Sequence, residues 1–138
     1  MSAIKRKRTG AHFTPPGVGT LVAERLAALL KEIEGSIRIL DPACGDGNLL
    51  QAMADVLSKG DRQRVTLIGI ENDPASFSAL RSRRPLFREC QSELIHADFL
   101  DFFSNDGLFD ECRSMEPVDV IIANPPYVRI MTWHFRTN

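Results

Sequence analysis

Four short runs of apolar residues along the chain predict β-strands. They lie at residues 37–40, 65–70, 93–96 and 118–123. Amphipathic helical patterns occur before the first run and between most of the others. Alternation of this kind is typical of an open α/β sheet, in which helices pack against the faces of the strands. The chain is therefore expected to form one α/β domain.

Three helices are predicted from the spacing of apolar residues. The first covers about residues 16–34, and its apolar stripe consists of Val18, Val22, Leu26, Leu29 and Ile33. The second has apolar residues at i, i+3, i+4 and i+7, namely Leu50, Met53, Ala54 and Leu57. Gly60 is expected to end this second helix. Asp73 is expected to cap a third helix, with Pro74 at its first position. The inward-facing residues of the third helix are Phe77 and Leu80.

The first strand leads into a glycine-rich turn that can hold a ligand. Gly45 and Gly47 permit positive φ and close approach of the backbone, so a ligand can sit over the turn. The turn does not match the G-x-G-x-x-G pattern of dinucleotide sites. Asp41 and Asp46 would repel a pyrophosphate, so the turn favours a neutral or cationic ligand.

The second and third strands also end in acidic residues. Glu71 is placed to accept hydrogen bonds from ribose hydroxyls, each worth about 1.5–3 kcal/mol to a charged acceptor. Asp98 beside Phe99 can hold an adenine amino group and ring. Taken singly, such features are also found as turn glycines, helix caps and loop acids. Together they are significant, because ligands of open α/β sheets bind at the carboxyl ends of the strands.

The fourth strand is followed by Asn124-Pro125-Pro126-Tyr127. Two prolines make the backbone rigid and remove two N–H donors, which leaves carbonyl acceptors. The Asn124 amide adds a further carbonyl, and Tyr127 offers a flat face for an aromatic ring. This tetrapeptide can therefore hold a planar amine, although a Pro-Pro turn with a buried tyrosine would give the same pattern.

Composition restricts the class of protein. The 138 residues are 43% hydrophobic, which suits one domain but is small for an enzyme that holds two large substrates. No run of 18 apolar residues and no apolar leader is found, so a cytoplasmic protein without membrane spans is expected. The spacing of Cys44, Cys90 and Cys112 and of the three histidines predicts neither a disulfide framework nor a metal site.

The net charge of −1 is unevenly distributed. The segment 5–8 holds four of the 17 basic residues, which leaves 13 basic and 18 acidic residues for the remaining positions. The body of the chain is therefore not expected to be a basic DNA-binding surface, and residues 1–10 are expected to form a basic flexible tail.

The four strand ends together resemble S-adenosylmethionine-dependent methyltransferases, and most closely the gamma group of N6-adenine DNA methyltransferases of restriction-modification systems. In that group the cofactor segments come first and Asn-Pro-Pro-Tyr follows, with no recognition domain between them. Only 25 residues separate Asp98 from Asn124. Residues 12–16 are similar to the N-terminal cofactor segment of the group. The resemblance covers about residues 9–129 and implies a Rossmann-like parallel sheet of order 3-2-1-4 that stops after the fourth strand.

The resemblance also implies a cofactor, S-adenosyl-L-methionine, and the residues that bind it. They are Thr14, Asp41, Ala43, Cys44, Gly45, Glu71, Asn72, Asp98, Phe99 and Asn124. Thr14 would contact the methionine moiety, and Asp41 would lie near its amino group. Residues 43–45 would line the turn under the cofactor, and Glu71 would hold the ribose. Asn72 would lie beside the cofactor adenine, and Asp98 with Phe99 would fix it.

The catalytic residues implied by the resemblance are Asn124, Pro125, Pro126 and Tyr127. Asn124 and the Pro125 carbonyl would accept hydrogen bonds from the N6 amine of a target adenine. Tyr127 would stack on that base after it is flipped from double-stranded DNA. Methyl transfer would be direct, with positioning supplying most of the acceleration.

Members of this family continue far beyond their Asn-Pro-Pro-Tyr motif. We therefore expect a partial catalytic domain at residues 11–129 and an atypical C-terminal end at 130–138. Such a fragment would have little activity alone and would need a missing C-terminal half or a recognition subunit. Two alternatives remain open at this point. The chain could belong to a protein-glutamine or ribosomal-RNA methyltransferase, or it could be a non-catalytic module that pairs with another chain through its open sheet edge.

Overall fold

The computed structural model describes residues 14–102 and 115–124. The predicted basic tail, the segment 125–127 of the tetrapeptide and the C-terminal end therefore lie outside the described residues.

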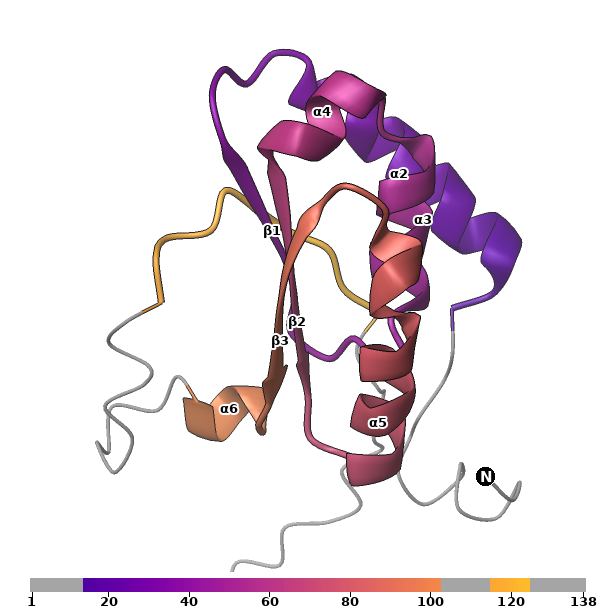
Figure 1. The fold of residues 1–138 in the computed structure, drawn as a ribbon, viewed down its shortest axis with the longest axis vertical. Coiled ribbons are helices and arrows are strands. Elements are labelled where there is room, and N and C mark those ends of the chain that lie inside the picture. The colour runs from indigo at the N-terminus through magenta and orange to yellow at the C-terminus, as the bar shows by residue number, and fades with distance from the viewer. Residues whose placement is uncertain (1–13, 103–114, 125–138) are drawn as a thin grey trace, which may run out of the picture.

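Four parallel strands form one sheet in the order β3-β2-β1-β4, as predicted (Figure 1). The strands are β1 (Ile37–Asp41), β2 (Val65–Glu71), β3 (Gln91–His96) and β4 (Val120–Ile121). β3 begins two residues earlier than predicted, and β4 is shorter than the predicted run. The backbone of β4 nevertheless continues its pairing on both sides, because Asp119 N–H bonds to Arg38 O and Ile122 N–H bonds to Leu40 O, each at 2.9 Å. All four strands end at the same edge of the sheet.

Three helices cover one face of the sheet: α2 (Pro16–Leu30), α3 (Asn48–Val56) and α5 (Pro74–Arg83) (Figure 1). α4 (Lys59–Arg64) connects α3 to β2, and a 3-10 turn, η1 (Arg84–Phe87), follows α5. A short helix, α6 (Phe99–Phe102), lies toward the other face. The larger core lies between the sheet and the three helices, and its fully buried members include Ile37, Ile39, Leu50, Met53, Leu67 and Leu80. A smaller cluster on the second face joins Leu40, Ile68, Ile70 and Phe102.

The apolar stripe predicted for the first helix does not coincide with the buried face of α2. Val18, Val22 and Leu29 are 52%, 41% and 62% exposed. The buried residues of this helix are Gly19, Ala23 and Leu30. Leu26 and Ile33, which belong to the predicted stripe, do pack against the core. Small side chains on the contact face let α2 pack closely on α3. The free energy gained from this close packing outweighs the gain from burying the larger apolar side chains one position away.

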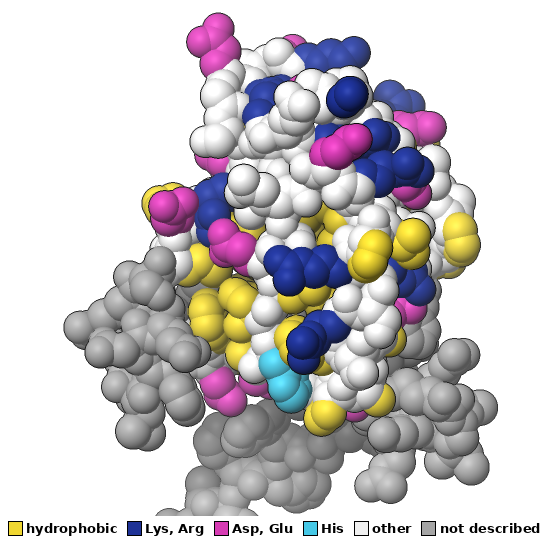
Figure 2. Space-filling view, viewed as in Figure 1, with side chains coloured by type: hydrophobic (Ala, Val, Ile, Leu, Met, Phe, Trp, Pro, Cys, Tyr) yellow, Lys and Arg dark blue, Asp and Glu magenta, His cyan; other side chains and the backbone are white. Residues whose placement is uncertain are grey.

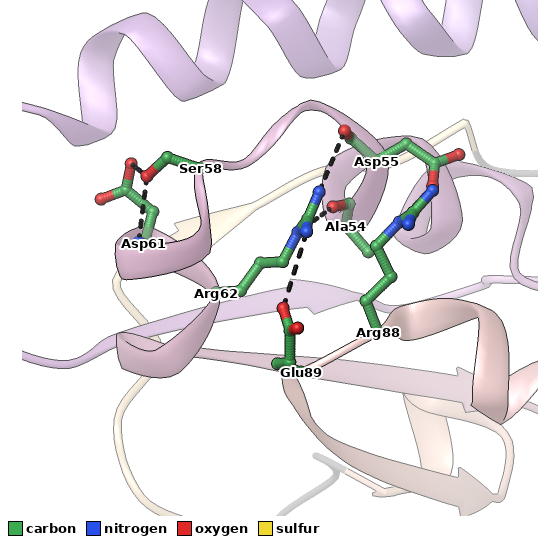
Figure 3. Close-up of polar contacts among 7 residues, drawn as sticks. All are labelled: Ala54, Asp55, Ser58, Asp61, Arg62, Arg88 and Glu89. Atoms are coloured by element: carbon green, nitrogen blue, oxygen red, sulfur yellow. Dashed lines mark hydrogen bonds and ion pairs between the residues drawn. The ribbon is translucent and has the colours of Figure 1, made fainter.

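The predicted inner residues of α3 are all buried, but Gly60 does not end the helix. α3 ends at Val56, and Gly60 lies inside α4, which Ser58 begins by accepting a hydrogen bond from Asp61 N–H at 3.1 Å. Figure 3 shows Arg62 of α4 reaching back to the end of α3, where its Nε donates to Ala54 O at 2.8 Å. A second segment thus satisfies the last carbonyl groups of α3, so no C-terminal glycine is required.

The start of α5 follows the prediction. The Asp73 carboxylate accepts a hydrogen bond from Ser76 N–H at 2.9 Å, and Pro74 is the first helical residue. Leu80 is fully buried. Phe77 packs against the core and stacks on His96, with ring centroids 4.8 Å apart.

Candidate functional site

A cavity of about 520 Å³ lies at the carboxyl ends of the strands. All ten residues predicted to bind a cofactor line it: Thr14, Asp41, Ala43, Cys44, Gly45, Glu71, Asn72, Asp98, Phe99 and Asn124. Sequence reasoning missed other lining residues, among them Asn48, Leu49, Ser76 and Leu100. The carboxyl ends of parallel strands meet at one edge of a sheet, which explains why residues up to 110 positions apart share this cavity.

The turn between β1 and α3 forms the floor of the cavity. Cys44 N–H bonds to Ile70 O at 3.0 Å, which fastens the turn to β2. Gly45 and Gly47 have φ of +57° and +88°, a region that side chains disfavour. A Cβ on Gly47 would also lie 2.7 Å from Leu80 Cδ1. The second glycine of the turn is therefore required by both its backbone angle and its packing.

Glu71 is held in one orientation at the end of β2. Its Oε2 accepts a hydrogen bond from Gly45 N–H at 2.8 Å, and its Oε1 accepts one from Asp73 N–H at 2.7 Å. A carboxylate has about four acceptor positions, so each oxygen keeps a lone pair for a ligand. Glu71 thus ties the glycine turn to the start of α5 while its carboxylate still lines the cavity.

Asp41 is the buried acid at the end of β1. Its side chain is 2% exposed, and Oδ1 accepts a hydrogen bond from Ala43 N–H at 3.3 Å. The pKa of Asp41 is raised to about 7, chiefly by burial; the hydrogen bond from Ala43 N–H lowers it and the negative charge of Glu71 raises it, both less strongly. A positively charged group of a ligand next to Asp41 would therefore stabilise the ionised form of its carboxyl group.

The far wall of the cavity is formed where β3 leads into α6. Asn72 Nδ2 donates to Asp98 Oδ2 at 3.3 Å, while Asp98 Oδ1 accepts from Leu100 N–H at 2.9 Å. His96 Nε2 lies 3.1 Å from the carbonyl oxygen of Asn72. These contacts join the ends of β2 and β3, so that Phe99 and Asp98 face the same space as predicted.

Asn124 reaches the cavity from the end of β4. Its Nδ2 donates to Thr14 Oγ1 at 3.1 Å, so the segment before α2 contacts the first residue of the tetrapeptide Asn124–Tyr127, which is called the amine clamp below. The other three residues of the tetrapeptide, Pro125, Pro126 and Tyr127, lie outside the described residues.

Arg83 of α5 contacts the turn between β1 and α3 and the start of α3, a role that the sequence did not reveal. Its guanidinium group contacts Asp46 at 3.3 Å, Gln51 at 3.2 Å and the side chain of Asn48. The partners lie 32–37 residues earlier in the chain, and no spacing rule links positions so far apart.

The charged residues that line the cavity are all acidic in the part of the chain that the structure describes. The cavity wall carries four carboxylates, from Asp41, Asp46, Glu71 and Asp98, and no Lys or Arg among the described residues. On the face seen in Figure 2, by contrast, acidic and basic side chains are interspersed over the upper part. The cavity therefore suits a ligand with positive charge or several hydrogen-bond donors, and it disfavours a pyrophosphate.

Cys44 is not equipped to act as a nucleophile. Burial raises the pKa of its thiol far above the ordinary value, so the reactive thiolate is scarce. Within residues 14–102 and 115–124, no three His, Cys, Asp or Glu side chains are grouped so as to hold a metal ion. In the same ranges, no helix has both the length and the apolar character needed to cross a membrane.

Comparisons with known proteins identify related sequences and structures. The sequence model of the family described as N-6 DNA methylase matches residues 1–137. The type II methyltransferase M.BanIII of Aneurinibacillus aneurinilyticus is 42% identical over 134 residues, which cover 91% of this chain and 23% of that protein. The type I restriction enzyme MpnII methylase subunit of Mycoplasma pneumoniae is 28% identical over 123 residues, which cover 88% of this chain and 22% of that protein.

A solved structure from Listeria monocytogenes, described as a class I S-adenosylmethionine-dependent methyltransferase, superposes with a TM-score of 0.64 at 27% identity. The match covers 85% of this chain and 32% of that one. The chain thus spans about a quarter of the length of the curated relatives it matches. With the family match over nearly every residue and the Rossmann-like sheet in the predicted order, the chain belongs to the N-6 DNA methylase family.

Proposed function

We propose that this chain binds S-adenosylmethionine in the cavity and forms the cofactor-binding part of an enzyme that methylates adenine N6 in DNA. The observation that carries the proposal is the convergence of all ten predicted cofactor residues on one cavity in a member of the N-6 DNA methylase family. When bound, the cofactor supplies an electrophilic methyl group on a positively charged sulfur.

The acidic wall favours such a ligand. Asp41 would accept the ligand ammonium group, and the cost of burying its carboxylate is then offset by an opposite charge. Glu71 would accept the two ribose hydroxyls with the lone pairs left free by Gly45 and Asp73. Because these backbone bonds already fix the carboxylate, little side-chain entropy is lost on binding.

The remaining lining residues would fix the two ends of the ligand. Asn72, Asp98 and Phe99, which line the cavity, would surround its adenine, and Thr14 would face its methionine moiety. The turn of residues 43–45 would lie beneath it, where Gly45 lets the backbone come close.

The target base would enter from the side of Asn124. The Asn124 and Pro125 carbonyl groups would accept the two N6 protons and turn the nitrogen lone pair toward the methyl group. Pro126 would keep the segment rigid, and Tyr127 would stack on the flipped base. Orientation of the amine, rather than a general base, would supply most of the rate.

Titration calorimetry with S-adenosylmethionine tests the cofactor site. Glu71→Ala removes two ribose acceptors and should weaken binding at least tenfold, since each bond to a charged acceptor is worth about 1.5–3 kcal/mol. Glu24→Gln on the exposed side of α2 is the matched control and should bind like the wild type. A folded wild-type chain that does not bind the cofactor, or an unchanged affinity of Glu71→Ala, would contradict the site.

Methylation assays test the reaction. The isolated chain is expected to bind the cofactor weakly and to methylate adenine in double-stranded DNA poorly or not at all, because it spans only 23% of the relative M.BanIII. Efficient site-specific methylation by the purified chain would refute the view that it is one part of a larger catalytic unit.

A further inference from the structure

The contact between Thr14 and Asn124 joins two segments that are 110 residues apart. Thr14 lies just before α2, where Pro15 O accepts hydrogen bonds from Val18 N–H and Gly19 N–H at 3.1 and 3.0 Å. Its methyl group packs over the first turn of that helix, 3.8 Å from where a Cβ on Gly19 would stand. The position of the hydroxyl group is therefore set by α2.

The backbone just before Asn124 is held in place by the sheet. Asn124 follows β4 by three residues, and Ile122 N–H bonds to Leu40 O at 2.9 Å, so the backbone leading to Asn124 is held by the sheet. Two prolines come next, and neither has an N–H that could bond to the Asn124 side chain. The Thr14 hydroxyl is the described partner of the Asn124 amide nitrogen, at 3.1 Å.

The orientation of a carboxamide decides what it can do. With Nδ2 bonded to Thr14, Oδ1 is left to accept a hydrogen bond from another group. The flipped amide would present N–H groups to the target amine, and two donors facing each other leave both unsatisfied. A hydroxyl group can donate as well as accept, so Thr14 selects one orientation only when its own proton is used elsewhere.

The geometry points to Thr14 as a positioning residue that links the cavity to the amine clamp. Thr14 lines the cavity, so an acceptor on the bound ligand can take the proton of its hydroxyl. Four carboxylates and no described Lys or Arg line the cavity, so a ligand carboxylate there depends on neutral donors such as this hydroxyl. The hydroxyl must then accept from Asn124 Nδ2, which turns Oδ1 toward the base. Occupation of the cavity by a carboxylate-bearing ligand thus prepares the clamp for an amine. This inference rests on the proposed function and adds a coupling between the cofactor and base sites.

Nuclear magnetic resonance of the Asn124 side-chain amide in the full chain tests the inference. In the ligand-free protein, the Nδ2 protons should exchange with solvent several-fold more slowly in the wild type and in Thr14→Ser than in Thr14→Val. Thr20→Val, which removes an exposed hydroxyl bonded to Pro16 O, is the matched control and should behave like the wild type. Equal exchange rates in the wild type and Thr14→Val would overturn the positioning role, whether or not the cofactor binds.

The coupling is tested with two probes. S-adenosylhomocysteine carries a carboxylate, whereas 5′-methylthioadenosine does not. The first should slow the exchange of the Asn124 Nδ2 protons further in the wild type and in Thr14→Ser, and the second should leave it unchanged. An equal effect of both probes, or an effect that survives in Thr14→Val, would refute the link. If neither probe binds the wild type, the proposed function and the link fail together, while the ligand-free comparison still decides the role of Thr14.

Discussion

Replacing Asp41 with asparagine should stabilise the ligand-free fold at neutral and alkaline pH. The side chain is 2% exposed, and its pKa is raised from 3.8 to about 7, chiefly by burial. A rise of about three pKa units corresponds to a penalty of about 4 kcal/mol for the ionised form in the folded state. Asparagine removes that charge and keeps an oxygen for the hydrogen bond from Ala43 N–H.

The pH dependence follows from the direction of the shift. Because the folded-state pKa of Asp41 is above its unfolded value, its penalty is absent below pH 3.8, where both states are protonated. The penalty grows as the pH rises and is complete above about 7. The advantage of Asp41→Asn should therefore increase from about 2 kcal/mol at pH 5 to about 4 kcal/mol at pH 8.

Urea denaturation at several pH values measures this free energy directly. Glu24→Gln is the control, because its carboxylate lies on the exposed side of α2. A stability difference between Asp41→Asn and the wild type that does not change between pH 5 and pH 8 would refute a raised pKa. The same substitution should weaken binding of S-adenosylmethionine, since the proposed partner of its ammonium group loses its charge.

Two further predictions concern packing and are tested by the same denaturation assay. Gly47→Ala should cost about 2–4 kcal/mol, because φ is +88° and the new Cβ would lie 2.7 Å from Leu80 Cδ1. Gly60→Ala, with no atom within 4 Å of the new Cβ, should be neutral or slightly stabilising, and equal losses in the two variants would contradict the turn geometry. Leu30→Ala should cost about 2–5 kcal/mol, whereas Leu29→Ala should change stability by less than about 0.5 kcal/mol. A larger loss for Leu29→Ala than for Leu30→Ala would indicate that the predicted apolar stripe of α2 is buried after all.

The residues of the cavity could be predicted because they follow strands. A strand reveals itself by a short apolar run, and the first polar residue after it must lie at the carboxyl edge of the sheet. Asp41, Glu71 and Asp98 were identified in this way, and all three line the cavity. The order of the strands was not available from spacing and came from the family resemblance.

The packing of α2 could not be predicted, because helical periodicity finds an apolar stripe without showing what lies opposite it. Val18, Val22 and Leu29 have the correct spacing, but the partner surface on α3 favours the small residues Gly19 and Ala23. The contacts of the arginine side chains were equally hidden. Arg83 and Arg64, for example, contact groups 29–37 residues earlier in the chain, which come close only in the folded protein.

Arg64 shows how these side chains act on the fold. Its guanidinium group donates to Leu30 O at 2.9 Å, Ile33 O at 2.6 Å and Gly35 O at 3.1 Å, so it bonds to carbonyl groups at the last residue of α2 and just after it. Its side chain is 24% exposed and also pairs with Asp61 at 2.9 Å.

Arg64→Met should therefore lower the free energy of unfolding by about 2–4 kcal/mol, because several bonds to a charged donor are lost from a partly buried site. The loss should persist at high salt, because salt screens short hydrogen bonds in a partly buried site only weakly. A contact to a DNA phosphate, by contrast, weakens steeply with salt. Arg25→Met on the exposed side of α2 is the control and should leave stability unchanged. A loss that vanishes at high salt would show that Arg64 acts on stability as a surface charge and would contradict the role of its hydrogen bonds.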